Sequence, residues 1–250
     1  MLLARDIDGP DTGRPVILLH SSVCDRRMWQ PQVAPLTGAG FRVVRVDFQG
    51  YGDTPPPSEP YDNARDVIDV LDALGLERVA VVGASFGGRV GQELAARWPD
   101  RVDTLVLLCA AMVGHPPTAA IERFATREDE LLEAGDVDEA VALNIRTFLG
   151  PAASDDTIDL VARMQRHVFE VQLPAPDIAA STVEYDLAAI TATTTVVTGR
   201  HDVDYFQQIA EVLTARIPGA RQVSLDWAGH LPSLESPDRL NPVLLDALRP

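Results

Sequence analysis

Short apolar runs recur along the chain and predict the strands of a parallel sheet. Residues 79–82 and 105–108 are wholly apolar and do not alternate with polar positions. Unbroken runs of this length, rich in β-branched residues, are typical of strands that are covered on both faces, as in a parallel sheet. The other predominantly apolar runs lie at residues 16–19, 43–46, 195–197 and 223–225.

Segments whose apolar residues follow helical spacing lie between several of these runs. The segment 64–74 places its apolar side chains at i, i+3, i+4 and i+7, which is the pattern of one buried helix face. A second segment after Gly88 shows the same spacing and stops at Pro99. Strands that alternate with helices across short turns predict a doubly wound, mostly parallel α/β sheet. Right-handed crossovers then place the functional loops at the carboxyl ends of the strands.

The alternation stops between residues 115 and 182, where helical segments at 118–134, 137–149 and 155–171 follow one another without a convincing strand. This stretch carries 13 acidic residues and five arginines, which is half of the chain's net charge. Helices inserted between two parallel strands would sit over the strands' carboxyl ends. We therefore predict a core domain of residues 1–114 and 183–250 with an inserted helical cap of residues 115–182. The alternative is a row of surface helices with no role at the site.

Composition and charge exclude several functional classes. The chain has 250 residues, of which 46% are hydrophobic and 23% charged, as in ordinary globular proteins. All 21 basic residues are arginine, and the absence of lysine excludes a Schiff-base enzyme and a P-loop. The net charge is −16 and the sequence offers no long basic patch, so no nucleic-acid or membrane partner is expected.

Cysteine usage and hydropathy indicate the compartment. Cys24 and Cys109 are too few for a disulfide framework or a structural zinc site, and neither a cofactor nor a metal is expected. The N-terminus turns polar after four residues, unlike a signal peptide. The longest apolar run, residues 105–114, is shorter than the ~18 residues of a spanning helix. We expect a cytoplasmic protein, as a monomer or a homodimer.

The most informative motif follows the strand predicted at residues 79–82. Gly83-Ala84-Ser85-Phe86-Gly87 fits the pattern G-x-S-x-G, with a predicted strand before it and a helix after it. A serine at this position sits on a sharp turn that raises its hydroxyl above the sheet, close to the helix N-terminus, which favours negative charge. Ser85 is therefore the candidate nucleophile. The alternative is a serine in a purely structural turn.

A serine hydroxyl is a poor nucleophile until a base removes its proton, and the base needs a third group to orient it. His230 lies in a loop just after the last predicted strand, and Asp202 follows the strand predicted at residues 195–197. These two residues are the candidate base and acid. Asp204, two residues further on, and Asp103, at the amino end of its strand, are weaker candidates for the acid.

Chemistry at a carbonyl also needs N–H donors for the developing oxyanion. The backbone N–H of Phe86, directly after the nucleophile, is one candidate. The loop after the first predicted strand should supply the second, with Ser22 as the first choice and Ser21 or Val23 as alternatives. His20 is expected to brace this loop by hydrogen bonds.

With these motifs, the chain resembles serine hydrolases of the α/β-hydrolase superfamily, and most of all the 3-oxoadipate enol-lactonase-like branch. The likeness extends from about residue 15 to residue 237 and includes the chain order Ser85, Asp202, His230. It implies an α/β-hydrolase fold with a helical cap and these three residues as a catalytic triad. Its other motifs are Arg27-Met28-Trp29, Asp47-Phe48-Gln49-Gly50-Tyr51-Gly52, Gly199-Arg200-His201-Asp202 and Ala228-Gly229-His230-Leu231-Pro232-Ser233-Leu234-Glu235.

Two positions depart from the family pattern. Ser21 stands where most relatives have glycine, although the enol-lactonase branch is similar to this chain there. Gln49 stands where arginine is usual, so an ion pair near the site is expected to be missing.

The leading hypothesis is a cofactor-independent carboxylesterase or lactonase that cleaves a carboxylic ester or lactone through an acyl-enzyme. Because the acidic cap should repel anions over roughly a Debye length, the small-molecule substrate is expected to be small, neutral and largely apolar. The alternatives are a C–C bond hydrolase or a perhydrolase with the same triad, and a small-molecule receptor that retains the triad. The candidate substrate-binding residues are Trp29, Met112, Phe124, Phe148 and Phe206.

Overall fold

The computed structural model describes residues 1–181 and 183–249. Within these residues, seven strands form one sheet in the order β1-β3-β2-β4-β5-β6-β7. Only the edge strand β1 (Arg5–Asp8) is antiparallel to its neighbour, β3. Each of the six predicted apolar runs lies in one of the parallel strands, which are β2 (Arg14–Leu19), β3 (Phe41–Val46), β4 (Val79–Ala84), β5 (Val102–Leu108), β6 (Thr193–Gly199) and β7 (Arg221–Leu225).

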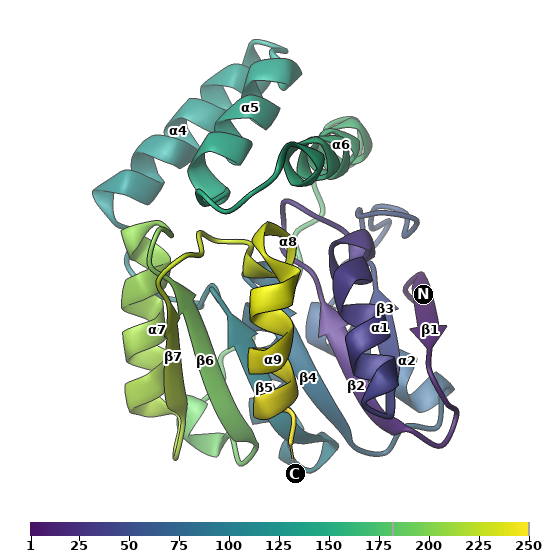
Figure 1. Ribbon diagram of the computed structural model, residues 1–250. Helices are drawn as coiled ribbons and strands as arrows, with labels where there is room; N and C mark the ends of the chain where they lie inside the picture. The colour runs from purple at the N-terminus through teal and green to yellow at the C-terminus, as the bar shows by residue number, and fades with distance from the viewer. Residues whose placement is uncertain (182, 250) are drawn as a thin grey trace.

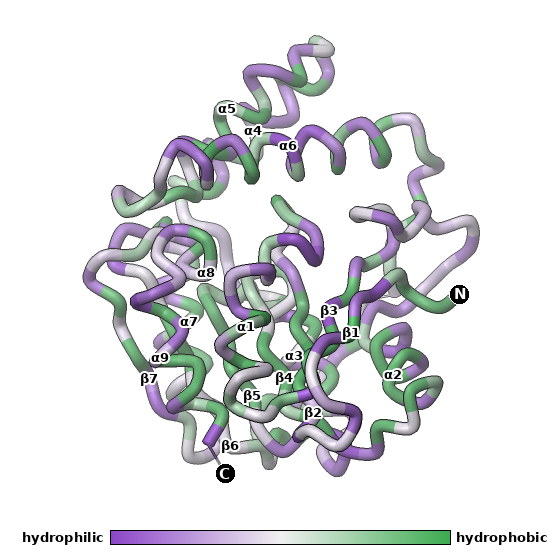
Figure 2. The backbone as a smooth tube through the Cα atoms, turned by 45° about the vertical axis from the view of Figure 1, so that its right-hand side comes forward, coloured by the Kyte–Doolittle hydropathy of each residue, from purple (hydrophilic) through white to green (hydrophobic). Residues whose placement is uncertain are grey.

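Helices cover both faces of the sheet, and successive strand residues point to opposite faces. Ile17 and Val81 pack in the core cluster that includes side chains of α2 (Asn63–Ala73), α3 (Phe86–Arg97) and α7 (Asp204–Arg216). Their neighbours Leu18 and Val82 pack in the cluster that includes α1 (Gln30–Gly38) and α9 (Pro237–Ala247), which cross in front of the strands in Figure 1. Burial on both faces favours apolar residues at successive strand positions, which explains the unbroken runs. In Figure 2 the central strands β4 and β5 are coloured mainly as hydrophobic.

Three further helices lie together above the carboxyl end of the sheet: α4 (Ala119–Glu133), α5 (Val137–Phe148) and α6 (Asp155–Gln172) (Figure 1). Their bounds lie within one residue of those predicted. Each helix begins at a capping side chain, from Thr118, Asp136 or Ser154, that accepts a backbone N–H three residues on. The predicted fold class, a doubly wound and mostly parallel sheet with a helical cap, is confirmed. In the described part of the chain, no helix is both long enough and apolar enough to cross a bilayer.

Candidate active site

The three residues of the predicted triad follow three parallel strands at the same edge of the sheet. Ser85 follows β4, Asp202 follows β6 and His230 follows β7. Since β4, β5, β6 and β7 are successive neighbours, the loops after their carboxyl ends lie side by side. All three side chains are withdrawn from solvent: Ser85 is 5% exposed, Asp202 6% and His230 1%.

The turn at Ser85 is strained and tightly packed. Ser85 has φ 49° and ψ −112°, a conformation that L-residues other than glycine rarely adopt. A Cβ on Gly83 would overlap the carbonyl of Gly87, and one on Gly87 would overlap the carbonyl of Leu19. The two glycines of the motif therefore let β4, α3 and β2 approach closely enough to hold this turn. The Ser85 N–H also donates to the Leu108 carbonyl of β5 at 2.9 Å.

Asp202 holds the imidazole of His230. Nδ1 of His230 lies 3.0 Å and 2.9 Å from the two carboxylate oxygens of Asp202. With Nδ1–H donating to the carboxylate, Nε2 is the nitrogen left to accept a proton. The other nearby acid, Asp204, accepts instead from the Thr118 hydroxyl at 2.6 Å. The structure thus brings Asp202, and not Asp204, to the histidine.

The loop that carries His230 is held from both sides by groups that sequence reasoning missed. The buried Glu235 carboxylate accepts the N–H of Gly229 at 2.7 Å and that of Leu231 at 2.9 Å. Burial raises the pKa of Glu235, and these backbone hydrogen bonds oppose the rise. The His230 N–H donates to the carbonyl of Phe148, the last residue of α5, at 2.9 Å. In the sequence, the signal that could have pointed to Glu235 was that it is the one acidic residue in the otherwise uncharged segment 227–237.

The two predicted oxyanion donors belong to segments that are joined by a hydrogen bond. The N–H of Gly87, in the first turn of α3, donates to the carbonyl of His20 at 3.0 Å. The Ser22 loop and the start of α3 are thereby fixed beside each other. Neither the Ser22 nor the Phe86 N–H has an acceptor within the described residues. Their role in binding an oxyanion stays a prediction.

His20 braces the loop after β2, as expected. Its Nδ1 lies 2.8 Å from the carbonyl of Ser21, and its Nε2 lies 3.0 Å from the N–H of Phe48. One ring nitrogen donates and the other accepts, so these contacts require a neutral imidazole. Complete burial lowers the pKa of His20 in agreement with this.

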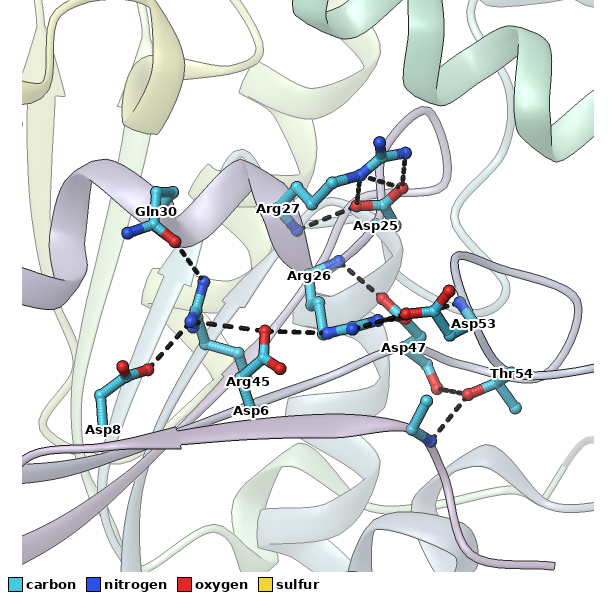
Figure 3. A network of polar contacts seen from close by, with 11 residues as sticks. Asp6, Asp8, Asp25, Arg26, Arg27, Gln30, Arg45, Asp47, Asp53 and Thr54 are labelled. Atoms are coloured by element: carbon cyan, nitrogen blue, oxygen red, sulfur yellow. Dashed lines mark hydrogen bonds and ion pairs between the residues drawn. The ribbon is translucent and has the colours of Figure 1, made fainter.

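Ion pairs hold the same loop against the segment 47–54 (Figure 3). Arg26 binds three carboxylates, among them the buried Asp47, which also accepts the Arg26 backbone N–H at 2.7 Å. Asp25 accepts both the backbone N–H and the guanidinium of Arg27. The charges of both arginines are therefore balanced locally, and the candidate oxyanion loop is anchored at its far end.

The burial of His20 predicts a stability change on the acid side of neutrality. In the unfolded chain His20 takes up a proton as the pH falls below about 6.5. The folded protein resists this protonation because the pKa of His20 is lowered, so the free energy of unfolding falls with pH, by at most about 1.4 kcal/mol per pH unit. Urea unfolding at pH 7.5, 6.5 and 5.5 measures the effect.

His20→Gln removes the titrating group and is expected to show a smaller drop between pH 6.5 and 5.5. His201→Gln, at an exposed position, is the matched control and should keep the wild-type drop. Equal drops in all three proteins would contradict a neutral, buried His20.

The five predicted substrate-binding residues separate into two groups. The rings of Phe206 and Phe148 lie 4.0 Å and 5.0 Å from the imidazole of the candidate base, and Phe124 packs on Phe148 at 4.8 Å. Trp29, by contrast, is completely buried in a core cluster. Met112 packs against the cluster of α2 and α3. The structure brings three of the five together, and their contact with a substrate stays a prediction.

A cleft of about 730 Å³ opens beside the start of α3. Tyr51, Phe86 and Arg89 line it from the core, and Glu128 and Phe169 line it from the cap helices. None of the five predicted substrate-binding residues is part of its wall. Ser85, Asp202 and His230 do not line it either, although Phe86, the residue after Ser85, does.

Gln49 also lines this cleft and shows what replaces the missing arginine. Its side-chain N–H donates to Asp66 on α2 at 2.7 Å. Burial raises the pKa of Asp66, and the hydrogen bond from Gln49 partly offsets this. A hydrogen bond from a neutral amide therefore joins Gln49 to Asp66, at the position where the resemblance implies an arginine.

One group of side chains in the described residues has the composition of a metal site. Ligand atoms of Cys109, Asp202 and His230 lie within 4.8 Å of one another. Asp202 and His230 already bind each other, and burial raises the pKa of the Cys109 thiol well above its usual value. Because metals bind the thiolate, this set fits a hydrogen-bonded acid–base pair better than a metal.

Comparisons with known proteins agree with the observed fold. Residues 16–243 match the model of the alpha/beta hydrolase family. A Caulobacter vibrioides protein named "Putative carbamate hydrolase RutD" is 31% identical over 254 residues, 96% of this chain and 92% of the relative. The 2-hydroxymuconate semialdehyde hydrolase of Pseudomonas putida is 31% identical over 256 residues, 91% of this chain and 84% of the relative.

Two solved structures are similar over nearly the whole chain. The enol-lactonase from Burkholderia xenovorans superposes with a TM-score of 0.80 at 26% identity, covering 98% of this chain and 96% of that one. A hydrolase from Pseudomonas aeruginosa gives a TM-score of 0.80 at 29% identity, covering 99% and 94%.

Proposed function

Because the chain belongs to the alpha/beta hydrolase family, we propose that it is a cofactor-independent serine hydrolase that cleaves a small carboxylic ester or lactone through an acyl-enzyme. The observation that carries the proposal is the buried Asp202–His230 pair at the sheet edge where Ser85 occupies a strained turn. In acyl transfer, a hydroxyl nucleophile needs a base that a carboxylate holds in the correct tautomer.

The residues divide the reaction between them. The Ser85 oxygen attacks the acyl carbon while Nε2 of His230 takes the hydroxyl proton, and Asp202 balances the charge of the imidazolium. The N–H groups of Ser22 and Phe86 bind the oxyanion. His230 then gives its proton to the leaving alcohol, or to the ring oxygen of a lactone. Water, deprotonated by His230, attacks the acyl-enzyme and releases the acid and Ser85.

Carbamate hydrolysis is a second candidate, because the name of a relative that aligns with 96% of this chain gives a carbamate as the substrate. A carbamate also presents a carbonyl bonded to an oxygen or nitrogen leaving group. The same nucleophile, base and oxyanion donors would serve it.

A substrate panel tests the proposal. We expect wild-type protein to turn over p-nitrophenyl esters of increasing acyl length, simple lactones or an aryl carbamate repeatedly, and Ser85→Ala to hydrolyse none of them. The proposal fails if no member of the panel is hydrolysed above the Ser85→Ala rate. If the protein instead hydrolysed its ligand only once or slowly, and its binding to another protein changed as a result, it would be a receptor.

A further inference from the structure

The cap junction (residues 149–154) connects α5 to α6 and lies directly against the His230 loop (residues 226–231). A Cβ on Gly150 would overlap the nitrogen of Gly229, and a Cβ on Gly229 would overlap the backbone of Gly150. Only glycine at both positions allows two backbones to approach this closely. The cap therefore meets the His230 loop one residue before the candidate base.

The carboxylate of Glu235 lies at this contact. Glu235 is the last residue of α8 (Pro232–Glu235), which lies below the connection from α5 to α6 in Figure 1. Its oxygens accept the N–H groups of Gly229 and Leu231, one on each side of the base, at 2.7 Å and 2.9 Å. Burial raises the pKa of this carboxylate, and the N–H groups of Gly229, Leu231 and Gly150 oppose the rise. One side chain thus joins the His230 loop to the cap junction.

The end of α5 also binds the base directly. The carbonyl of Phe148 accepts the His230 N–H at 2.9 Å, and the two rings lie 5.0 Å apart. The last carbonyls of a helix lack partners within the helix, so the end of α5 has an acceptor to offer. The backbone that carries the base is therefore bonded to the cap as well as to the core.

Two buried carboxylates face the imidazole of His230. Asp202 accepts from Nδ1 directly. Glu235 acts across the loop: burial raises its pKa, whereas its backbone hydrogen bonds and the charge of a protonated His230 oppose the rise. This electrostatic interaction is mutual, so an ionised Glu235 stabilises the imidazolium that forms when the base takes up a proton.

Three other ionisable groups on the elements around the ring are neutral or bonded elsewhere. Burial raises the pKa of the Cys109 thiol well above its usual value, so the thiol is uncharged at neutral pH. Asp204, at the start of α7, binds Thr118, and Arg146, near the end of α5, binds Glu139. A change of charge at position 235 should therefore be felt at the base with little compensation.

We propose that Glu235 is a positioning residue through which the cap holds the catalytic base, with Gly150 as its contact on the cap. The proposal rests on the proposed function and adds that the cap acts on the chemical step itself. Displacement of the cap junction would free the His230 loop and misplace Nε2 of His230 with respect to Ser85. A misplacement of about 1 Å can lower a rate by about 10²-fold.

Glu235→Gln tests the carboxylate. The amide keeps one acceptor oxygen and replaces the other with an NH₂ group, so one of the two N–H groups beside the base loses its acceptor. We expect kcat for a p-nitrophenyl ester to fall about 10- to 100-fold, with KM within about threefold of wild type. The acid limb of the kcat/KM profile should move to lower pH by about half a unit or more, because a negative charge near the imidazolium is lost. Glu211→Gln, at an exposed position on α7, is the matched control and should change neither.

Gly150→Ala tests the same contact from the cap and keeps the carboxylate, so it also serves if Glu235→Gln does not fold. The added Cβ overlaps the Gly229 nitrogen and the Glu235 carboxylate and should push the cap junction away from the His230 loop. We expect kcat to fall at least about tenfold. Gly38→Ala is the matched control, because a Cβ there meets open space, and it should keep the wild-type kcat.

Hydrogen exchange, followed by mass spectrometry, gives a readout that needs no substrate. Glu235→Gln and Gly150→Ala should each speed amide exchange at least about tenfold in both the cap junction and the His230 loop. The two controls should exchange as wild type does. Wild-type exchange rates in both segments of both variants would overturn the inference.

The outcomes separate this inference from the proposed function. If wild type hydrolyses an ester in a Ser85-dependent way, but both variants keep kcat within about threefold, the inference is wrong and the hydrolase proposal stands. The same conclusion follows if kcat falls only in step with thermal stability and the acid limb of Glu235→Gln stays in place, since Glu235 would then serve the fold alone. If wild type hydrolyses no ester, the hydrolase proposal fails, and hydrogen exchange decides whether the cap holds the loop through Glu235.

Discussion

Ser85→Ala is expected to fold as the wild type does and to lose turnover by up to about 10⁶-fold in kcat. The substitution removes the attacking oxygen but leaves the packing of the turn, because alanine keeps the Cβ and loses only the hydroxyl. Relief of the unusual φ of 49° is not expected, since β4 and α3 still impose it. Ester hydrolysis under saturating substrate measures the loss, and thermal unfolding confirms that the fold is kept.

Ser58→Ala is the matched control, because it removes a hydroxyl from an exposed loop and should leave kcat unchanged. If Ser85→Ala kept more than a tenth of the wild-type kcat, another residue would have to be the nucleophile.

Asp202→Asn is expected to lower kcat on the order of 10⁴-fold with little effect on the fold. The carboxylate accepts from Nδ1 of His230 with both oxygens. An amide at the same place can donate to Nδ1, which favours the tautomer with the proton on Nε2. That nitrogen then cannot take the proton of Ser85. The kcat of an activated ester, compared with wild type, reports the loss.

Asp204→Asn is the matched control for the acid. Asp204 is bonded to Thr118 and not to His230, so its substitution should change kcat by less than about twofold. A larger loss in Asp204→Asn than in Asp202→Asn would move the role of the acid to Asp204.

Much of the fold could be predicted because each part leaves a strong local pattern. Parallel strands covered on both faces favour unbroken apolar runs, and β4 and residues 105–108 of β5 show this directly. The cap helices have regular spacing and good N-terminal caps. Helix α1 is harder to predict, because Pro31 and Pro35 interrupt its sequence. The predicted superfamily is confirmed by the match over residues 16–243.

The candidate site could be predicted only where a motif fixes the backbone. The turn at Ser85 requires glycines two residues away on each side, so its sequence is recognisable. Glu235 acts through two backbone N–H groups, so its role left only a weak signal, a single acidic residue in an otherwise uncharged segment.

Covalent labelling with a fluorophosphonate, located by peptide mass spectrometry, tests the central claim most directly. The reagent reacts with a serine only where a base activates the hydroxyl. We predict one equivalent of label per chain, carried by Ser85, and a loss of labelling in Asp202→Asn in parallel with the loss of kcat. Labelling at another residue, or an esterase that hydrolyses its substrates but takes no label at Ser85, would contradict the account.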